Sequence, residues 1–311
     1  MRGSERSLAR HVSVDKAVDI VGLGREGLRP IPTDDQFRVR VDAMEQAIAG
    51  DKRAGIRPAC IVAMAGTTNT GAIDDLAALK AIADREGLWL HGDAAYGGGM
   101  LLSHESPGLL RGIELCDSIT IDPHKWFYAP VDAGALLVRD ERVLAHSFGQ
   151  RPAYLTDEFD ETSQRYQYYV HGLEQSRRFR ALKVWMSFKR YGADEIGNWV
   201  DRNVAQARRL HERVLSHPRF ESAVEPPMSA VCIRYVPERH LGDAGVRRLH
   251  HIVTERVERS GAFWIGTTEL KGRTFFRACP VNFRTTLDHM DRLLELLERE
   301  CRHAERSMVL E

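Results

Sequence analysis

The chain has 311 residues, enough for one large or two ordinary domains, and its 44 basic and 44 acidic residues cancel. This balance argues against a general binder of nucleic acid or of anionic membranes. No apolar stretch approaches the roughly 20 residues that span a membrane, and the N-terminus lacks the apolar core of a signal peptide. We therefore expect a cytoplasmic protein that binds neither nucleic acid nor membrane.

The five cysteines are scattered, with no C-x-x-C pair among positions 60, 116, 232, 279 and 301. Their odd number and wide spacing indicate neither a disulfide framework nor a structural zinc site. We predict no metal.

The first predicted element is a helix that begins after His11 and closes at Gly22 or Gly24. Apolar residues recur along it at helical spacing, namely Val14, Ala17, Val18 and Val21. Taken alone, a histidine ahead of a helix is more often a solvated loop residue than a ligand. Residues 25–58 carry a loop and a second amphipathic helix, which we expect to serve packing.

Three apolar runs predict buried strands at residues 59–65, 88–90 and 118–121, with a helix at 75–86 between the first two. Asp93 follows the second strand and Lys125 the third. In an α/β sheet ligands bind outside the carboxyl ends of the strands, so these two side chains are expected at neighbouring strand ends.

A lysine and a carboxylate in this arrangement suit pyridoxal phosphate. The amine of Lys125 can form a Schiff base with the cofactor aldehyde, and the carboxylate of Asp93 can keep the pyridine nitrogen protonated. The small residues Ala94, Ala95 and 97–99 would let a flat ring lie close to the backbone.

Three segments carry a resemblance to a known family: AMAGTTNTGAIDD at 63–75, HGDAAYGG at 91–98 and DPHKW at 122–126. Together they resemble the group II pyridoxal phosphate-dependent decarboxylases, the family of the aromatic amino acid, histidine and glutamate decarboxylases. The resemblance runs from about Ser7 to the C-terminus. It implies a fold type I transferase-like large α/β domain, with a mainly parallel sheet, at residues 1–195. A small C-terminal α+β domain would occupy 196–311.

The resemblance also implies roles for single residues. His11 would stack on the cofactor ring, and Thr68 would bind near the ring substituents or the substrate carboxylate. Ala95 would contact the cofactor, Ser118 would lie near its phosphate, and His124 would lie close to its link with the lysine.

Asp122 departs from the family pattern, because many relatives carry asparagine there. An extra carboxylate beside a dianionic phosphate would be unfavourable unless it points away. We therefore leave Asp122 outside the predicted site.

Residues 148–174 show little periodicity but hold four tyrosines. A loop of this length in a compact domain is usually functional or disordered. In the family a mobile loop here closes over the site, and its tyrosine helps to protonate the carbanion left by loss of CO2. Tyr154 matches that context, and a solvated aromatic loop is the alternative.

The last part of the chain alternates helices and strands. We predict helices at 176–192, from about 198, at 245–260 and at 287–299, and strands at 230–236, 263–268 and 273–278. This order resembles the small domain of a fold type I enzyme.

The predicted activity is decarboxylation of an L-amino acid to the amine and CO2 through a Lys125 Schiff base, in a homodimer. A fold type I aminotransferase or lyase is the first alternative, because it shares the aspartate and the lysine. Relatives carry a dimerisation segment and a phosphate-binding loop upstream of the His11 region, and we expect this chain to lack that part. The second alternative is therefore an inactive or half-enzyme fragment that acts only with a partner chain.

Overall fold

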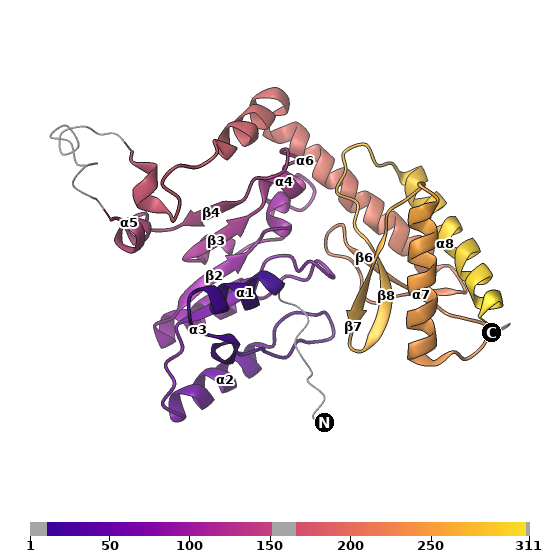
Figure 1. The fold of residues 1–311 in the computed structure, drawn as a ribbon, viewed down its shortest axis with the longest axis horizontal. Helices are drawn as coiled ribbons and strands as arrows, with labels where there is room; N and C mark the ends of the chain where they lie inside the picture. Colours follow the sequence, from indigo (N-terminus) through magenta and orange to yellow (C-terminus); the bar gives the residue numbers. More distant parts are fainter. Residues whose placement is uncertain (1–10, 151–165, 309–311) are drawn as a thin grey trace.

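The described part of the chain contains two sheets, joined by one long helix (Figure 1). The computed structural model describes residues 11–150 and 166–308. Within these ranges we find no helix that is both long and apolar enough to cross a membrane.

The first sheet is mostly parallel and has the order β1-β2-β3-β4. Its strands are β1 (Cys60–Met64), β2 (Trp89–Asp93), β3 (Ser118–Ile121) and β4 (Ala135–Val138). β1, β2 and β3 run parallel, and β4 pairs with β3 in the opposite direction. Met64 pairs with Asp93, and Asp93 pairs with Thr120, so the carboxyl ends of three strands meet at one edge.

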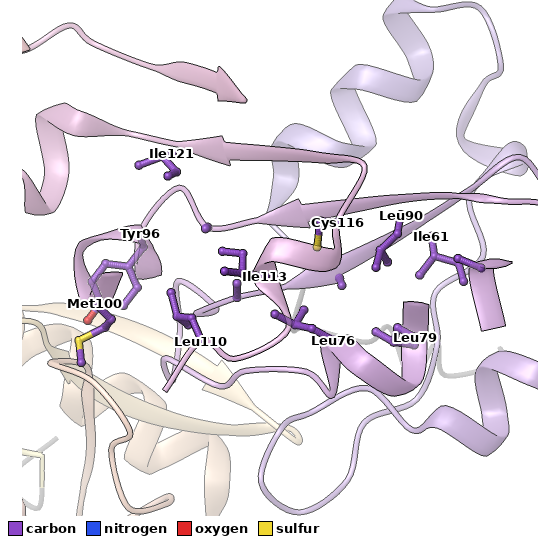
Figure 2. Packing of buried hydrophobic residues seen from close by; sticks show 14 of the residues in the cluster. Ile61, Leu76, Leu79, Leu90, Tyr96, Met100, Leu110, Ile113, Cys116 and Ile121 are labelled. Carbon is purple, nitrogen blue, oxygen red and sulfur yellow. The ribbon is translucent and has the colours of Figure 1, made fainter. Parts of the chain in front are cut away.

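Helices and turns of the N-terminal unit, residues 11–150, surround this sheet. They are α1 (Val12–Ile20), η1 (Arg25–Gly27), α2 (Val41–Arg53), α3 (Leu76–Glu86), η2 (Gly97–Leu102), η3 (Ile113–Leu115), α4 (Pro123–Trp126) and α5 (Arg142–Phe148). The Asp75 side chain caps α3 by accepting a hydrogen bond from the Ala78 amide. Apolar residues of the sheet and α3 form one core, which includes Ile61, Leu76, Leu79 and Leu90 (Figure 2).

The second sheet is antiparallel and forms the C-terminal unit, residues 216–308, together with two helices. Its order is β5-β6-β8-β7. The elements are β5 (Phe220–Ser222), β6 (Val231–Tyr235), α7 (Gly242–Arg259), β7 (Gly266–Leu270), β8 (Arg273–Ala278) and α8 (Leu287–Ser307). A second apolar core lies between this sheet and the helices.

After η5 (Tyr168–His171), helix α6 (Arg180–Leu215) connects the two units. It is interrupted at Gly192, whose φ of 79° and ψ of 162° are not helical. Beyond this kink α6 enters both cores: Val200 and Val204 belong to the first, and Ala207, Leu210 and Val214 to the second.

The predicted α/β architecture, with a mainly parallel sheet followed by a smaller α+β part, is confirmed. Strands 118–121 and 273–278 have their predicted bounds. Strand β5 is not predicted, because three residues are too short a run to show a strand period.

Candidate active site

Three predicted site residues follow consecutive parallel strands. Thr68 lies in the turn after β1, Asp93 is the last residue of β2, and Lys125 lies in the short helix α4 after β3. Because these strands are parallel neighbours, the three residues come to the same edge of the sheet.

The backbone of Ala95 connects the aspartate to the lysine segment. The Ala95 amide donates to Oδ1 of Asp93 over 3.1 Å, and the Ala95 carbonyl accepts from the Asp122 amide over 3.2 Å. The main chain of Ala95 therefore ties the acidic residue to the segment that carries Lys125.

Asp93 is a buried carboxylate, with 8% of its surface exposed. Across residues 11–150 and 166–308, no basic side chain forms an ion pair with it. Burying a carboxylate without a cation is costly. A protonated pyridine nitrogen would supply the missing positive charge, so this residue fits the cofactor that the sequence predicts.

The Lys125 amine lies 2.8 Å from Oδ2 of Asp122, three residues earlier. The lysine side chain is 34% exposed and the aspartate side chain 20%. The Asp122 carboxylate is therefore directed at the lysine amine, a contact that the sequence did not predict. Sequence reasoning weighed this charge against the phosphate alone and overlooked that residues three apart in a helical turn lie side by side.

His124 is held by the backbone of Ala133. Its Nδ1 lies 2.6 Å from the Ala133 carbonyl oxygen and 3.1 Å from the Ala133 amide nitrogen. Its other nitrogen, Nε2, lies 4.0 Å from Oδ2 of Asp122. His124 and Lys125 therefore flank the same carboxylate, and His124 keeps one ring nitrogen directed toward the site.

Ser118 begins β3 and is bound within the sheet. Its hydroxyl accepts from Nε1 of Trp89 over 2.8 Å and lies 2.8 Å from Nδ1 of His91. Nε2 of His91 lies 3.2 Å from the Thr120 hydroxyl. Burial lowers the pKa of His91, which favours the neutral ring in this bridge. The phosphate role of Ser118 stays a prediction.

Thr68 is exposed, whereas its neighbour Thr67 is buried. The Thr67 hydroxyl accepts a hydrogen bond from the Ala72 amide over 3.1 Å and so closes the turn after β1. Of the two threonines, Thr68 is the one that can reach a ligand.

His11 is the N-cap of α1 and is exposed. Its Nδ1 accepts from the Ser13 amide over 3.2 Å and lies 2.8 Å from the Ser13 hydroxyl. The structure thus gives His11 a capping role, and its stacking on a ring stays a prediction. Tyr154 lies outside the described residues.

The small residues of the glycine-rich segment serve protein packing. A Cβ at Gly97 would overlap the carbonyl oxygen of Ala65, and one at Gly99 would lie 2.6 Å from Cβ of Trp126. Trp126 in turn stacks on Tyr96, with ring centroids 5.0 Å apart. These glycines are therefore required by their contacts with Ala65 and α4, and their role in making room for a flat ring stays a prediction.

Taken together, these features define an α/β protein with a lysine amine and a buried carboxylate at one sheet edge, and no basic side chain in the described part of the chain pairs with that carboxylate. Residues 6–236 match the family model described as the pyridoxal-dependent decarboxylase conserved domain.

Two relatives and one solved structure illustrate the similarity. The chain is 34% identical to an aromatic-L-amino-acid decarboxylase of Bacillus atrophaeus, over 90% of this chain and 58% of that protein. It is 32% identical to an L-2,4-diaminobutyrate decarboxylase of Acinetobacter baumannii, over 91% and 55%. The crystal structure of Oryza sativa TDC with PLP and tryptamine superposes with a TM-score of 0.89 and 27% identity, over 95% of this chain and 61% of that one.

The chain belongs to the pyridoxal-dependent decarboxylase family. The expected family, its cofactor pyridoxal 5'-phosphate and the predicted fold class are thereby confirmed. The chain spans little more than half the length of the two relatives named.

Proposed function

We propose that this chain removes the carboxyl group of an L-amino acid as CO2, with pyridoxal phosphate attached to Lys125. The observation that carries the proposal is the buried Asp93 carboxylate, which pairs with no basic side chain of residues 11–150 and 166–308, at the sheet edge that also bears Lys125. When bound, the cofactor supplies an aldehyde that reacts with amines and a ring that accepts electrons.

The residues of the site have different proposed roles in the reaction. Asp93 keeps a proton on the pyridine nitrogen, and Asp122 holds the Lys125 amine. His124, whose Nε2 lies 4.0 Å from the same Asp122 carboxylate, assists proton transfer near that amine. Tyr154 is proposed as the general acid that returns a proton to Cα.

The remaining predicted residues bind and orient. We assign His11 to the ring face, Thr68 to the ring substituents or the substrate carboxylate, and Ala95 and Ser118 to further cofactor contacts. The proposed substrate is an L-amino acid, and we assign no particular side chain to it. The relatives named above are decarboxylases of aromatic amino acids and of diaminobutyrate.

A homodimer in the cytoplasm is the proposed working form. Exposed apolar side chains at the start of α6 support an interface, since its N-cap Phe179 is 73%, Trp185 60% and Met186 57% exposed. Light scattering after gel filtration would measure the mass, and a monomer at all concentrations would contradict the dimer.

The first experiment adds pyridoxal phosphate to the purified chain, reduces with borohydride and locates the label by peptide mass spectrometry. We expect the label on Lys125 and its loss in Lys125→Ala. Lys80→Ala is the matched control, because Lys80 pairs with Asp84 and Asp117 instead. No label on Lys125 in a folded chain would contradict the proposal and favour a half-enzyme that needs a partner chain.

A second experiment separates reaction types. The labelled chain is incubated with a panel of amino acids, and CO2 release is measured beside formation of 2-oxo acid. Release of CO2 with the amine as product is expected. Transfer of the amino group without CO2 would instead identify an aminotransferase.

A further inference from the structure

Asn203 of α6 is completely buried and forms a hydrogen bond at each position that its side chain offers. Its Oδ1 accepts from Nε1 of Trp126 over 3.1 Å and from the Tyr128 hydroxyl over 2.7 Å. Its Nδ2 donates to Oε1 of Gln206 over 3.0 Å and to the Asn282 carbonyl over 3.2 Å. An asparagine has two acceptor and two donor positions, so this one is fully used.

The two sides of Asn203 contact different parts of the molecule. Trp126 and Tyr128 belong to the lysine segment, which we define as residues 122–129, whereas Asn282 belongs to the C-terminal unit. Nε2 of Gln206 extends the network by donating to the Thr285 carbonyl over 2.6 Å. One buried side chain therefore joins the segment around the cofactor lysine to the C-terminal unit.

A second contact reinforces the same connection. Trp126 stacks on Tyr96, and the Tyr96 hydroxyl lies 2.7 Å from that of Ser229 in the C-terminal unit. Figure 2 shows Tyr96 at the end of the first core that faces the C-terminal unit. The indole next to Lys125 is thus tied to the C-terminal unit through both its edge and its face.

Tyr128 holds an unfavourable backbone conformation within this network. Its φ is 55°, in the left-handed region that bulky residues rarely adopt. Its ring packs edge-on against Phe283 of the C-terminal unit, with centroids 5.9 Å apart. Such a conformation persists only where the surrounding contacts impose it.

We propose that Asn203 is a positioning residue for Lys125: it makes the geometry of the lysine segment depend on the docking of the C-terminal unit. Loss of either side of the network leaves buried polar groups without partners, and this weakens the hold on the segment. The expected effect on cofactor attachment rests on the proposed function. The hydrogen-bonded connection between the lysine segment and the C-terminal unit does not depend on it.

Tyr128→Phe is the first test, because it removes one hydroxyl and keeps the ring. Tyr235→Phe is its matched control: the Tyr235 hydroxyl is also buried and donates to Glu305 over 2.9 Å, within the C-terminal unit. We expect amide hydrogen exchange in residues 122–129 to become about fivefold faster in Tyr128→Phe and to stay unchanged in Tyr235→Phe, as loss of one internal hydrogen bond implies. Equal effects of both variants would overturn the proposal.

Asn203→Asp is the second variant, because it keeps an acceptor for Trp126 and Tyr128 and removes the donor to Asn282. The proposal predicts faster exchange in residues 122–129 although their own hydrogen bonds to residue 203 remain. Unchanged exchange in that segment, in a folded variant, would show that the C-terminal unit does not act on it.

The rate of borohydride-trapped cofactor attachment at Lys125 is measured in the same set of proteins. We expect it to fall about fivefold in Tyr128→Phe and Asn203→Asp but not in Tyr235→Phe. An unmodified chain that takes up no cofactor would refute the proposed function, while the exchange measurement would still decide the role of Asn203.

Discussion

The sheets of the two units differ in how completely their apolar strand residues are covered. In the C-terminal unit all five residues of β6 are buried. In the N-terminal unit Leu136 and Leu137 of the edge strand β4 are 52% and 51% exposed, and α1 buries none of its residues. The proposed chemistry lies in the unit whose sheet has the exposed strand β4, and the unit with the buried strand β6 supports it.

This contrast predicts that substitutions separate into two groups. Changes at the sheet edge of the N-terminal unit should reduce cofactor binding and leave folding nearly intact. Changes in the C-terminal core should lower the free energy of unfolding and leave cofactor binding nearly intact.

The largest expected effect is that of Asp93→Asn. It removes the charge that balances a protonated pyridine, so we expect cofactor affinity to fall about a thousandfold, or roughly 4 kcal/mol. Absorbance titration measures the Kd. Asp201→Asn is the matched control, since Asp201 is equally buried but binds Ser103 and His104. Similar losses of cofactor affinity in both variants would mean that the loss comes from general disturbance of the fold and not from the charge of Asp93.

Leu297→Ala should have the opposite profile. Leu297 is fully buried in the C-terminal core, and its truncation should lower the free energy of unfolding by about 3 kcal/mol. Urea denaturation measures this loss. Cofactor affinity, measured well below the unfolding midpoint, should stay within twofold of that of the unmodified chain. A larger drop in affinity would contradict the division of substitutions into two groups.

Acidification should lower the stability of the C-terminal unit, mainly through protonation of His250. Burial lowers the pKa of His250 from 6.5 to about 3, and the charges of Arg234 and His251 add to this. The unfolded chain binds the proton below pH 6.5 and the folded chain only near pH 3. The contribution of His250 to the free energy of unfolding is therefore fully present above pH 6.5 and is lost as the pH falls below that value.

Between pH 7 and pH 5 this loss amounts to about 2 kcal/mol. It is measured by urea denaturation at the two pH values. His250→Gln should remove most of the pH dependence, whereas the exposed His240→Gln should retain it. Identical pH profiles for the two variants would assign the effect to other groups.

A smaller effect of opposite sign is expected in the N-terminal unit from Asp74. Burial raises its pKa from 3.8 to about 6, against the Val39 and Met64 amides that donate to it over 2.7 Å. A raised carboxyl pKa contributes stability at low pH that is lost as the pH rises through 6. The loss from pH 5 to pH 7 is about 1 kcal/mol.

Hydrogen exchange of the Val39 amide reports this change locally. Asp74→Asn should make its protection independent of pH between 5 and 7. Asp75→Asn, at the neighbouring helix cap, should not. A pH response that survives Asp74→Asn would contradict the assignment.

Local pattern was sufficient for much of the fold. Strand β3 is a short apolar run bounded by polar residues, and the break between two predicted helices agrees with the kink at Gly192. The meeting of Asp93 and Lys125 at one edge followed from parallel strand order alone.

What sequence reasoning missed depends on contacts between distant residues. Asn203 is one polar residue in an amphipathic helix, and nothing in its neighbourhood in the chain indicates partners at 126, 128 and 282. The packing role of the glycines at 97–99 was missed for the same reason, because Ala65, Ile121 and Trp126 are what exclude a side chain there.

The passage of α6 through both cores constrains how the gene can change. Each residue turns a helix by about 100°, so one inserted between Val204 and Ala207 would rotate one core face relative to the other. Exposed positions of this stretch can accept new side chains, but its length cannot vary. Insertions and deletions among homologues should therefore concentrate in the connections outside α6.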